Sequence, residues 1–406
     1  MSVRNRLVAA LVQHASLELP LVRVEDHGAS FGVAATGAPL AILTHRGEPL
    51  SAFANRLVAL MEAQATTIYL VIAGADPQMP AFFADLVSRA PDLRSLGLYH
   101  LTTDGKLVHI DGRHLGALEA AAKKMPEIPA LSASELEVLV ADAQHKHSEA
   151  VQFTQQTRRR FPLVSLVLGG MCVLLFFRFG AAEGGSAISV AGANIGSLVK
   201  NGQVWRWLSS LFLHGSQSHL LMNMLSLYFV GTFLEQVVGR ARYLLIYGLS
   251  GLGASMASSL LGADVWSVGA SGAIWGVMAA GYGLALRPSG ILPPVIASRI
   301  KRGLSTPLLI NIGISFLPGI DLRAHFGGGA VGLLLALSGL LGNSSASGEQ
   351  SQRALNKGES VPTPKWIVGA AALVGGLMVA ALVVALQHTL ALLAAPSGGL
   401  PPGAVQ

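Results

Sequence analysis

Apolar runs long enough to cross a membrane recur through the second half of this chain, and they constrain its fold more than any other feature. Of the 406 residues, 51% are hydrophobic and only 12% are charged, whereas about a quarter of the residues in a soluble domain are charged. Charged side chains are common before Arg160 and sparse from Phe161 to Leu341. The pattern therefore predicts an all-α polytopic membrane bundle that follows a soluble N-terminal region.

Seven segments have the hydropathy of membrane-spanning helices, each of which needs about 20 mostly apolar residues. The fifth segment is shorter than the others. The seven expected spans cover residues 163–179, 218–236, 243–261, 268–286, 305–319, 324–342 and 366–394.

The distribution of basic residues predicts how these helices are oriented. Arg158, Arg159 and Arg160 stand immediately before the first span, and the loops after the even-numbered spans are richer in Arg and Lys than the loops on the other side. Because basic loops tend to stay in the cytoplasm, we expect a cytoplasmic N-terminus and a C-terminus outside. Membrane flanks account for the net charge of +6, so no nucleic-acid partner is expected.

We expect this multi-pass protein in the inner (plasma) membrane of a bacterial cell. Residues 1–20 predict an amphipathic helix without an uninterrupted apolar run, so they do not resemble a signal peptide. The acidic residues Glu18, Glu25 and Asp26 argue against a transit peptide. A mitochondrial inner membrane is the alternative compartment.

Residues 1–150 predict a cytosolic α/β domain, because short apolar runs alternate with helical periodicity. Asp104-Gly105 has the composition of a hairpin turn between the last two strands. Strands are expected at 40–44, 67–73, 98–101 and 106–110, and helices at 50–63, 80–88 and 131–149.

A group of ionisable residues in this domain allows two interpretations. The group could bind a divalent metal ion, or it could consist of surface histidines on a hairpin, which is the favoured interpretation. Its members are His100, His109, His114 and Asp111. The single cysteine, Cys172, lies in an apolar span, so neither a disulfide framework nor a Cys-based metal site is expected.

The other segments are expected to connect or flank these parts. The long loop between the first two spans, residues 180–217, contains Trp205-Arg206-Trp207, and aromatic segments of this type lie in the membrane interface. Arg206 is expected to pair with lipid headgroups or with loop carbonyl groups. The remaining boundaries are a basic linker at 151–161, a six-span core at 162–342, a cytosolic linker at 343–365, a seventh transmembrane helix at 366–395 and a disordered tail at 396–406.

Gly269-Ala270-Ser271-Gly272 stands where a loop turns into the fourth span. Glycines allow unusual backbone conformations and close approach, and the unpaired N–H groups of a helix N-terminus can stabilise a developing negative charge. These properties are typical of a serine nucleophile. However, Gly272-xxx-Gly276-xxx-Ala280 is also a helix-packing pattern, so a catalytic function needs a base and an oxyanion hole from elsewhere in the chain.

Two further spans begin with polar residues that could complete such a site. His219 and Asn223 lie four residues apart at the start of the second span, so they share one helix face. His325 stands at the start of the sixth span, ahead of Gly328-xxx-Gly332. Polar groups inside a span are costly and indicate function by default. All of them, with Ser271, lie near the outer ends of their helices, so we expect them at one depth.

The glycine face of the sixth span is expected to pack on the small-residue face of the fourth, because small residues let two helices approach closely. This packing would place His325 next to Ser271. For His219 alone, an interhelical polar clamp is the alternative interpretation. His214 is expected at the membrane interface.

This ordered set resembles the rhomboid family of intramembrane serine proteases, over about residues 163–342. The resemblance implies a rhomboid fold with a six-helix core, here with one added C-terminal helix and an N-terminal α/β soluble domain, as in a subgroup of bacterial rhomboids. The residues that carry it are Trp205-Arg206, His219-xxx-Asn223, Gly269-Ala-Ser271-Gly272, Ala324-His325 and Gly328-xxx-Gly332.

The resemblance assigns a role to each site residue of a serine endopeptidase. Ser271 would be the nucleophile and His325 the general base. The oxyanion hole would be formed by His219, Asn223 and the backbone N–H of Ser271, and Gly269 would line the site. No cofactor and no metal ion are implied.

Three further features follow from the comparison with the family pattern. Trp275 stands where the family often has a tyrosine beneath the histidine; an indole can also stack on imidazole, so we expect altered substrate preference. Asp321 could orient His325, although capping of the helix start is the favoured interpretation. The fifth span would be a mobile gate, so a crosslink between the fifth and second spans should slow cleavage.

The implied substrates are single-span membrane proteins, cut within or near the outer end of a helix that unwinds easily. The bilayer is the other expected partner, and the soluble domain could recruit substrates, sense a ligand or bind an adaptor. The alternatives are a catalytically inactive rhomboid-like protein that binds membrane clients, and a small transporter. We favour the protease because Ser271 and His325 are both present and no internal repeat is evident.

Overall fold

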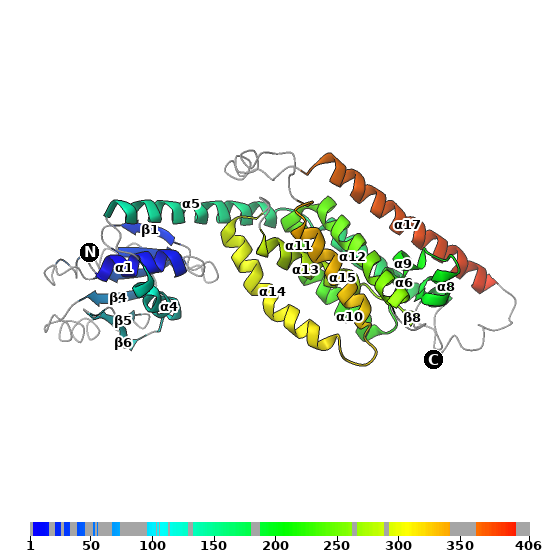
Figure 1. Ribbon diagram of the computed structural model, residues 1–406, viewed down its shortest axis with the longest axis horizontal. Coiled ribbons are helices and arrows are strands. Elements are labelled where there is room, and N and C mark those ends of the chain that lie inside the picture. Colours follow the sequence, from blue (N-terminus) through cyan, green and yellow to red (C-terminus); the bar gives the residue numbers. More distant parts are fainter. Residues whose placement is uncertain are drawn as a thin grey trace. The chain divides into compact units, whose positions relative to one another are not determined.

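The computed structural model separates the chain into two compact units, Met1–Ala150 and Val151–Gln406 (Figure 1). Each unit is described by itself below. The structure describes Ala52, Asn55 and, except for positions 103, 105 and 113, residues 3–15, 21–25, 28–32, 39–44, 67–73, 96–128, 133–179, 187–261, 266–287, 292–341 and 363–394.

A six-stranded sheet forms the centre of the first unit, with its strands in chain order from β1 to β6. β3, β4 and β5 are parallel, and the other neighbours pair antiparallel. The strands are β1 (Leu21–Glu25), β2 (Gly28–Gly32), β3 (Pro39–Thr44), β4 (Thr67–Ala73), β5 (Leu96–Leu101) and β6 (Leu107–Gly112).

The four predicted strands are present as β3 to β6, each within two residues of its expected ends. β5 and β6 form the predicted hairpin, where the hydroxyl of Thr102 donates to the carbonyl of Lys106 over 2.9 Å. β1 and β2 were not predicted, because β1 is short and β2, with the sequence GASFG, is rich in glycine. The helices expected at 50–63 and 80–88 lie outside the described residues, apart from Ala52 and Asn55.

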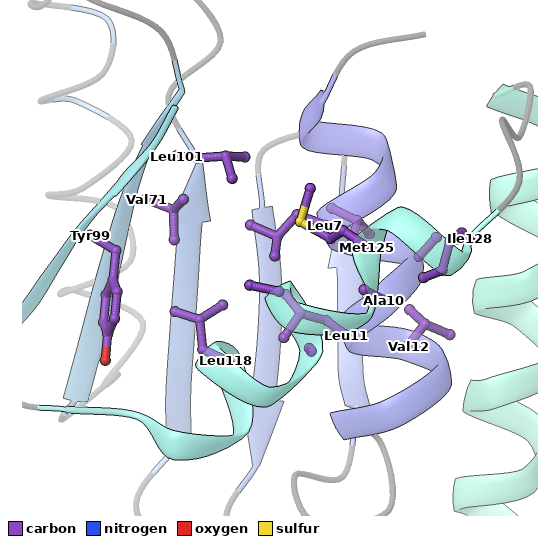
Figure 2. Close-up of a cluster of buried hydrophobic side chains, with 14 residues drawn as sticks. Leu7, Ala10, Leu11, Val12, Val71, Tyr99, Leu101, Leu118, Met125 and Ile128 are labelled. Carbon is purple, nitrogen blue, oxygen red and sulfur yellow. The ribbon is translucent and has the colours of Figure 1, made fainter. Parts of the chain in front are cut away.

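The core of this unit lies between the sheet and the helices α1 (Val3–Ala10) and α4 (Gly116–Lys124) (Figure 2). Leu7 and Leu11 face the strand residues Val71 and Leu101, and Leu118 of α4 closes the same cluster. The helix predicted at the N-terminus is present, but residues 7–12 do not have the exposed face of an amphipathic helix. All six residues from Leu7 to Val12 are buried, because α4 and the turn after it pack on this segment as well.

α5 (Ala133–Arg158) follows this core and is longer than the predicted helix at 131–149. Its last turns occupy most of the segment that was expected to be a basic linker. The predicted linker at 343–365 is described only from residue 363, and the predicted tail at 396–406 lies outside the described residues.

The second unit is a helical bundle with a two-stranded pairing, β7 with β8, beside it. Its long second helical segment contains a π-helical turn, Leu227–Gly231, between α10 and α11. The elements are α6 (Leu163–Phe179), α7 (Ala187–Gly192), β7 (Asn194–Ile195), α8 (Gly196–Lys200), α9 (Arg206–Ser209), α10 (Gln217–Ser226), α11 (Thr232–Val238), α12 (Arg240–Leu261), β8 (Trp266–Ser267), α13 (Ser271–Leu286), α14 (Pro294–Ile314), α15 (Leu322–Leu337) and α17 (Lys365–Ala394).

Several of these helices have the length and composition of membrane spans, so the chain is a mostly helical, multi-pass membrane protein. Three segments qualify on their own within the described residues, Gln217–Val238, Arg240–Leu261 and Lys365–Ala394. A fourth qualifies if Ala141–Arg158 and Leu163–Phe179 form one bent span. The apolar helices α13 and α15 have only 16 residues each, which is shorter than a usual span.

The fifth span was predicted at 305–319, and that range is wrong. α14 begins at Pro294, eleven residues earlier, and ends at Ile314. Its first turns carry Arg299, Lys301 and Arg302, which lower the hydropathy without breaking the helix. Hydropathy reports which part of a helix suits lipid, whereas Pro294 at the first helical position reports where the helix starts.

The centre of the bundle is a junction of α12, α13 and α15 in which backbones touch. A Cβ atom on Gly328 would lie 2.0 Å from the carbonyl oxygen of Gly272, and one on Gly332 would lie 2.0 Å from that of Gly276. On the other side, a Cβ on Gly276 would lie 2.1 Å from the side chain of Ser250. The predicted packing of the two small-residue faces is thus confirmed. α14 packs on α13 and α17 packs on α12, on opposite sides of the bundle (Figure 1).

The first helix of the bundle, α6, is joined to the end of α11 by reciprocal hydrogen bonds. The buried carboxylate of Glu235 accepts from the backbone N–H groups of Val164 and Ser165, at 2.9 and 2.7 Å, and from the Ser165 hydroxyl. In return, the guanidinium of Arg160 donates to the carbonyl groups of Gln236 and Val237. The unpaired backbone groups of two helix ends are therefore satisfied together.

Candidate active site

Ser271 is the first residue of α13, and the backbone before it places the side chain at the helix mouth. Gly269 has a φ of 128°, a conformation that only glycine adopts readily. Its N–H donates to the carbonyl of Ser210 over 3.0 Å, which ties the turn to the segment after α9. Ser271 is half-buried, so its hydroxyl lies at the edge of the bundle rather than inside it.

His325 lies in the first turn of α15, and its Nε2 atom is 3.0 Å from Oγ of Ser271. The imidazole is 7% exposed. Asp321 caps this helix, because its carboxylate accepts the N–H of Ala324 over 3.0 Å and the hydroxyl of Ser258 over 2.5 Å. The capping interpretation of Asp321 is therefore confirmed, and both of its carboxylate oxygens accept hydrogen bonds from groups other than His325.

His219 and Asn223 lie on one face of α10, which Ser216 caps by accepting the N–H of His219 over 3.2 Å. The side-chain amide of Asn223 donates one hydrogen to the carbonyl of His219 over 2.9 Å, so its second N–H is available to another acceptor. The ring of His219 reaches the serine loop, because a Cβ on Gly269 would lie 2.7 Å from its Nε2 atom. The structure thus brings together Ser271, His325, His219 and Gly269, with Asn223 one turn away.

Trp275 lies one turn below Ser271 and forms the floor of this site. Its ring centroid is 5.8 Å from that of His325, with a tilt of 32° between the planes. It also contacts Phe326 with centroids 5.7 Å apart. The indole is therefore in contact with the imidazole but inclined to it, and it narrows the space beneath the histidine.

Arg206 and His214, which precede α10, are both buried, although a position at the membrane interface was considered for each. Arg206 donates to the carbonyl groups of Val190 and Ala193, at 3.0 and 2.8 Å, which answers the choice between headgroups and loop carbonyls. Burial lowers the pKa of Arg206 to about 10, so it stays protonated at neutral pH. His214 is 5% exposed rather than interfacial. Burial, with help from His219, lowers the pKa of His214 to about 3, so it is neutral at physiological pH.

Ser315 was missed in the sequence. It follows the last residue of α14, is 1% exposed, and its Oγ atom lies 2.8 Å from Nδ1 of His325. No local pattern marks this serine, because only the fold brings the end of α14 against the first turn of α15.

The histidines of the first unit make a different arrangement from a metal site. His109 and His114 stack with ring centroids 3.7 Å apart, and His114 forms an ion pair with Glu119 over 2.9 Å. The pKa of Glu119 is lowered, mainly by its hydrogen bond with His114. Among the residues that the structure describes, no three His, Cys, Asp or Glu side chains are grouped as a metal site.

The close approach at Gly269 makes a prediction. In Gly269→Ala, the added methyl group meets His219 in a backbone conformation that alanine rarely adopts, so one of the two must move. We expect the rate at which a serine-reactive fluorophosphonate labels Ser271 to fall by about 100-fold, because displacement of a reacting group by about 1 Å has an effect of this size. Gly202→Ala is the matched control, since Gly202 also has positive φ but nothing within 4 Å of its added Cβ. Equal loss of the labelling rate in both variants would show that backbone strain alone is responsible.

Comparison with known proteins identifies the second unit. Residues 201–342 match the Rhomboid domain. The chain is 38% identical over 149 residues to RHOMBOID-like protein 4 of Arabidopsis thaliana, which covers 36% of this chain and 37% of that protein. It is 32% identical over 197 residues to the rhomboid protease GluP of Bacillus subtilis, covering 48% of this chain and 37% of that protein.

A bacterial relative is matched over most of its own length. The chain is 31% identical over 220 residues to the rhomboid protease AarA of Providencia stuartii, which covers 47% of this chain and 78% of that protein. Two plant relatives are matched over smaller shares of their length, 37% for RHOMBOID-like protein 4 and 52% for RHOMBOID-like protein 1 of Arabidopsis thaliana. The Rhomboid match includes Ser271 and His325, and with the extensive match to AarA it shows that the chain belongs to the rhomboid family.

Proposed function

We propose that this protein is an intramembrane serine endopeptidase in which Ser271 is the nucleophile and His325 the general base. The observation that carries the proposal is the distance of 3.0 Å between Ser271 Oγ and His325 Nε2, held by the backbone contact of α13 and α15. A serine hydroxyl within hydrogen-bond reach of a buried imidazole is the arrangement that activates a nucleophile.

The reaction is an acyl transfer in two steps. As Ser271 Oγ attacks the carbonyl carbon of the scissile bond, its proton passes to Nε2 of His325. The histidine then gives this proton to the leaving amine, and the acyl group stays on the serine. In the second step His325 takes a proton from a water molecule as its oxygen attacks the ester carbon. The C–O bond to Ser271 then breaks, His325 returns the proton to Ser271 Oγ, and the carboxylic acid leaves.

The negative oxygen of each tetrahedral intermediate would be stabilised by three donors, namely the N–H of Ser271, the His219 ring and the free N–H of Asn223. The first belongs to the opening turn of α13, where backbone N–H groups have no partner within the helix. The other two share one face of α10 beside the serine loop. Removal of one such donor typically lowers kcat by about 10²–10³-fold.

The proposed substrates are single-span membrane proteins that are cut within or near the outer end of their helix. Trp275 would set part of the preference by limiting the space under His325. The proposal includes seven spans, with α17 as the seventh, a cytoplasmic N-terminus and a C-terminus outside the inner (plasma) membrane. The first unit would be a cytosolic α/β domain of a bacterial-type rhomboid that binds a ligand or an adaptor.

The test is covalent labelling of the detergent-solubilised full-length protein with a small fluorophosphonate. Wild type should be labelled, and Ser271→Ala and His325→Ala should lose the label while they keep the melting temperature of wild type to within a few degrees. Retention of label in Ser271→Ala would place the nucleophile elsewhere. A folded wild type that stays unlabelled would favour the catalytically inactive, client-binding rhomboid-like protein instead.

A further inference from the structure

A third polar side chain, that of Ser315, lies against the Ser271–His325 pair, and it comes from the end of a different helix, α14. Ser315 stands immediately after α14, and its hydroxyl oxygen is 2.8 Å from Nδ1 of His325. With an exposure of 1%, it is more deeply buried than either partner in the pair. The turn after α14 also contacts α15 through Phe316 and Phe326, whose ring centroids are 6.2 Å apart.

The hydrogen bonds around Ser315 determine which nitrogen of His325 carries the proton. Ser315 Oγ is also 2.7 Å from the carbonyl oxygen of Asn311, and a carbonyl can only accept. If the hydroxyl donates to Asn311, its lone pair is free to accept from Nδ1–H, and both contacts are hydrogen bonds. If it donates to His325 instead, the contact with Asn311 loses its proton and becomes a repulsion between two acceptors.

A proton on Nδ1 leaves the lone pair of Nε2 free in a neutral imidazole. That lone pair faces Ser271 Oγ, which is the arrangement required of a general base. We propose that Ser315 is a positioning residue that holds His325 in its catalytic tautomer and orientation through the chain Asn311–Ser315–His325–Ser271. This inference rests on the proposed protease function.

The chain of hydrogen bonds has the order of a catalytic triad, with a hydroxyl where an acid usually stands. Asp321, the carboxylate nearest in sequence, is occupied by the cap of α15 and by Ser258. A neutral acceptor orients the ring but adds no charge to stabilise the imidazolium, so its removal should matter less than the loss of a triad aspartate, which lowers kcat by about 10⁴-fold.

The test compares Ser315→Ala with Ser315→Thr and with a control on the same helix. Ser305 donates to the carbonyl four residues before it, at 2.7 Å, as Ser315 does, but it is only half-buried. Ser305→Ala therefore removes the same kind of helix bond without touching His325. Two rates are measured on the full-length protein in detergent: labelling of Ser271 by a small fluorophosphonate, and cleavage of a single-span membrane substrate.

We expect Ser315→Ala to lower both the labelling rate and kcat by about tenfold, the effect of one lost hydrogen bond, while KM changes by less than about twofold. Ser315→Thr keeps the hydroxyl and should restore at least half of the labelling rate, and Ser305→Ala should equal wild type. A thermal melt of each variant accompanies the rates. If Ser315→Thr is destabilised, the split between kcat and KM in Ser315→Ala decides alone.

Two results would overturn the inference while leaving the protease proposal intact. Equal labelling of wild type and Ser315→Ala would show that the hydroxyl has no part in orienting the base. Faster labelling or a lower KM in Ser315→Ala would show that the bond is a latch that holds α14 against the site. Absence of label on wild type would instead defeat the proposed function, and this inference with it.

Discussion

Replacement of His325 by alanine is expected to lower kcat for cleavage of a single-span membrane substrate by about 10⁶-fold, which is the loss found when the base of a serine protease is removed. The physical reason is that a serine hydroxyl is a poor nucleophile at neutral pH unless a base takes its proton as it attacks. His325 is the imidazole 3.0 Å from Ser271 Oγ, and the neighbouring His219 is placed against Gly269 rather than against the hydroxyl.

The measurement is a single-turnover assay with purified enzyme in excess over a reporter whose helix carries small residues near its outer end. His388→Ala is the matched control, because His388 lies on α17 and stacks on Trp205 at 5.2 Å, outside the site. We expect the control to stay within about threefold of wild type, in the range of a surface substitution. Residual activity of more than one part in a thousand in His325→Ala would mean that another group serves as the base.

The second large effect is expected for Gly328→Ala, one turn after His325. The added methyl group would lie 2.0 Å from the carbonyl oxygen of Gly272, and backbone on both sides leaves it no flexible side chain to displace. The two helices must therefore separate. We expect a loss of stability of about 2–3 kcal/mol, as for an overpacked core, and a loss of activity of about 100-fold, because His325 moves away from Ser271.

The control for this prediction is a glycine-to-alanine substitution that is expected to raise stability rather than lower it. Gly376 lies in α17, and a Cβ on it would meet nothing within 4 Å. Gly376→Ala should leave activity unchanged and raise stability by up to about 1 kcal/mol, because alanine favours a helix over glycine. The two melts and the two values of kcat/KM check the prediction. A Gly328→Ala protein as active as wild type would show that α13 and α15 can separate enough to accept the methyl group without displacing His325.

Those parts of the fold that depend on local composition could be predicted. Small residues four apart indicate the close approach of α13 and α15, and the carboxylate of Asp321 before a helix indicates a cap, so both features can be predicted from the sequence. The same holds for the four strands of alternating or continuous apolar residues. Two elements could not be predicted in this way. The glycine-rich β2 has no alternation of apolar residues. The first half of α14 contains basic residues, which lower its hydropathy below that of a membrane span.

Only those site residues that belong to a recognisable sequence motif could be predicted. Ser271, His325, His219 and Asn223 each occur beside a recognisable glycine or at helical spacing. Ser315 has no such neighbour, because its position against His325 depends on where a helix ends and on how that helix packs. For Arg206, the sequence limits the expected partners to lipid headgroups or loop carbonyl groups. The folded loop shows that the partners are the carbonyl groups of Val190 and Ala193.

The hydrogen-bonded joint between α6 and α11 has a mechanical consequence. The chain passes from α5 to α6 through Arg160, so tension applied along α5 toward α6 would act on this joint. Its bonds to Glu235, Gln236 and Val237 lie close together in the sequence and share the force in parallel. Because the bonds act side by side, several of them would have to break together before the start of α6 could separate from the end of α11.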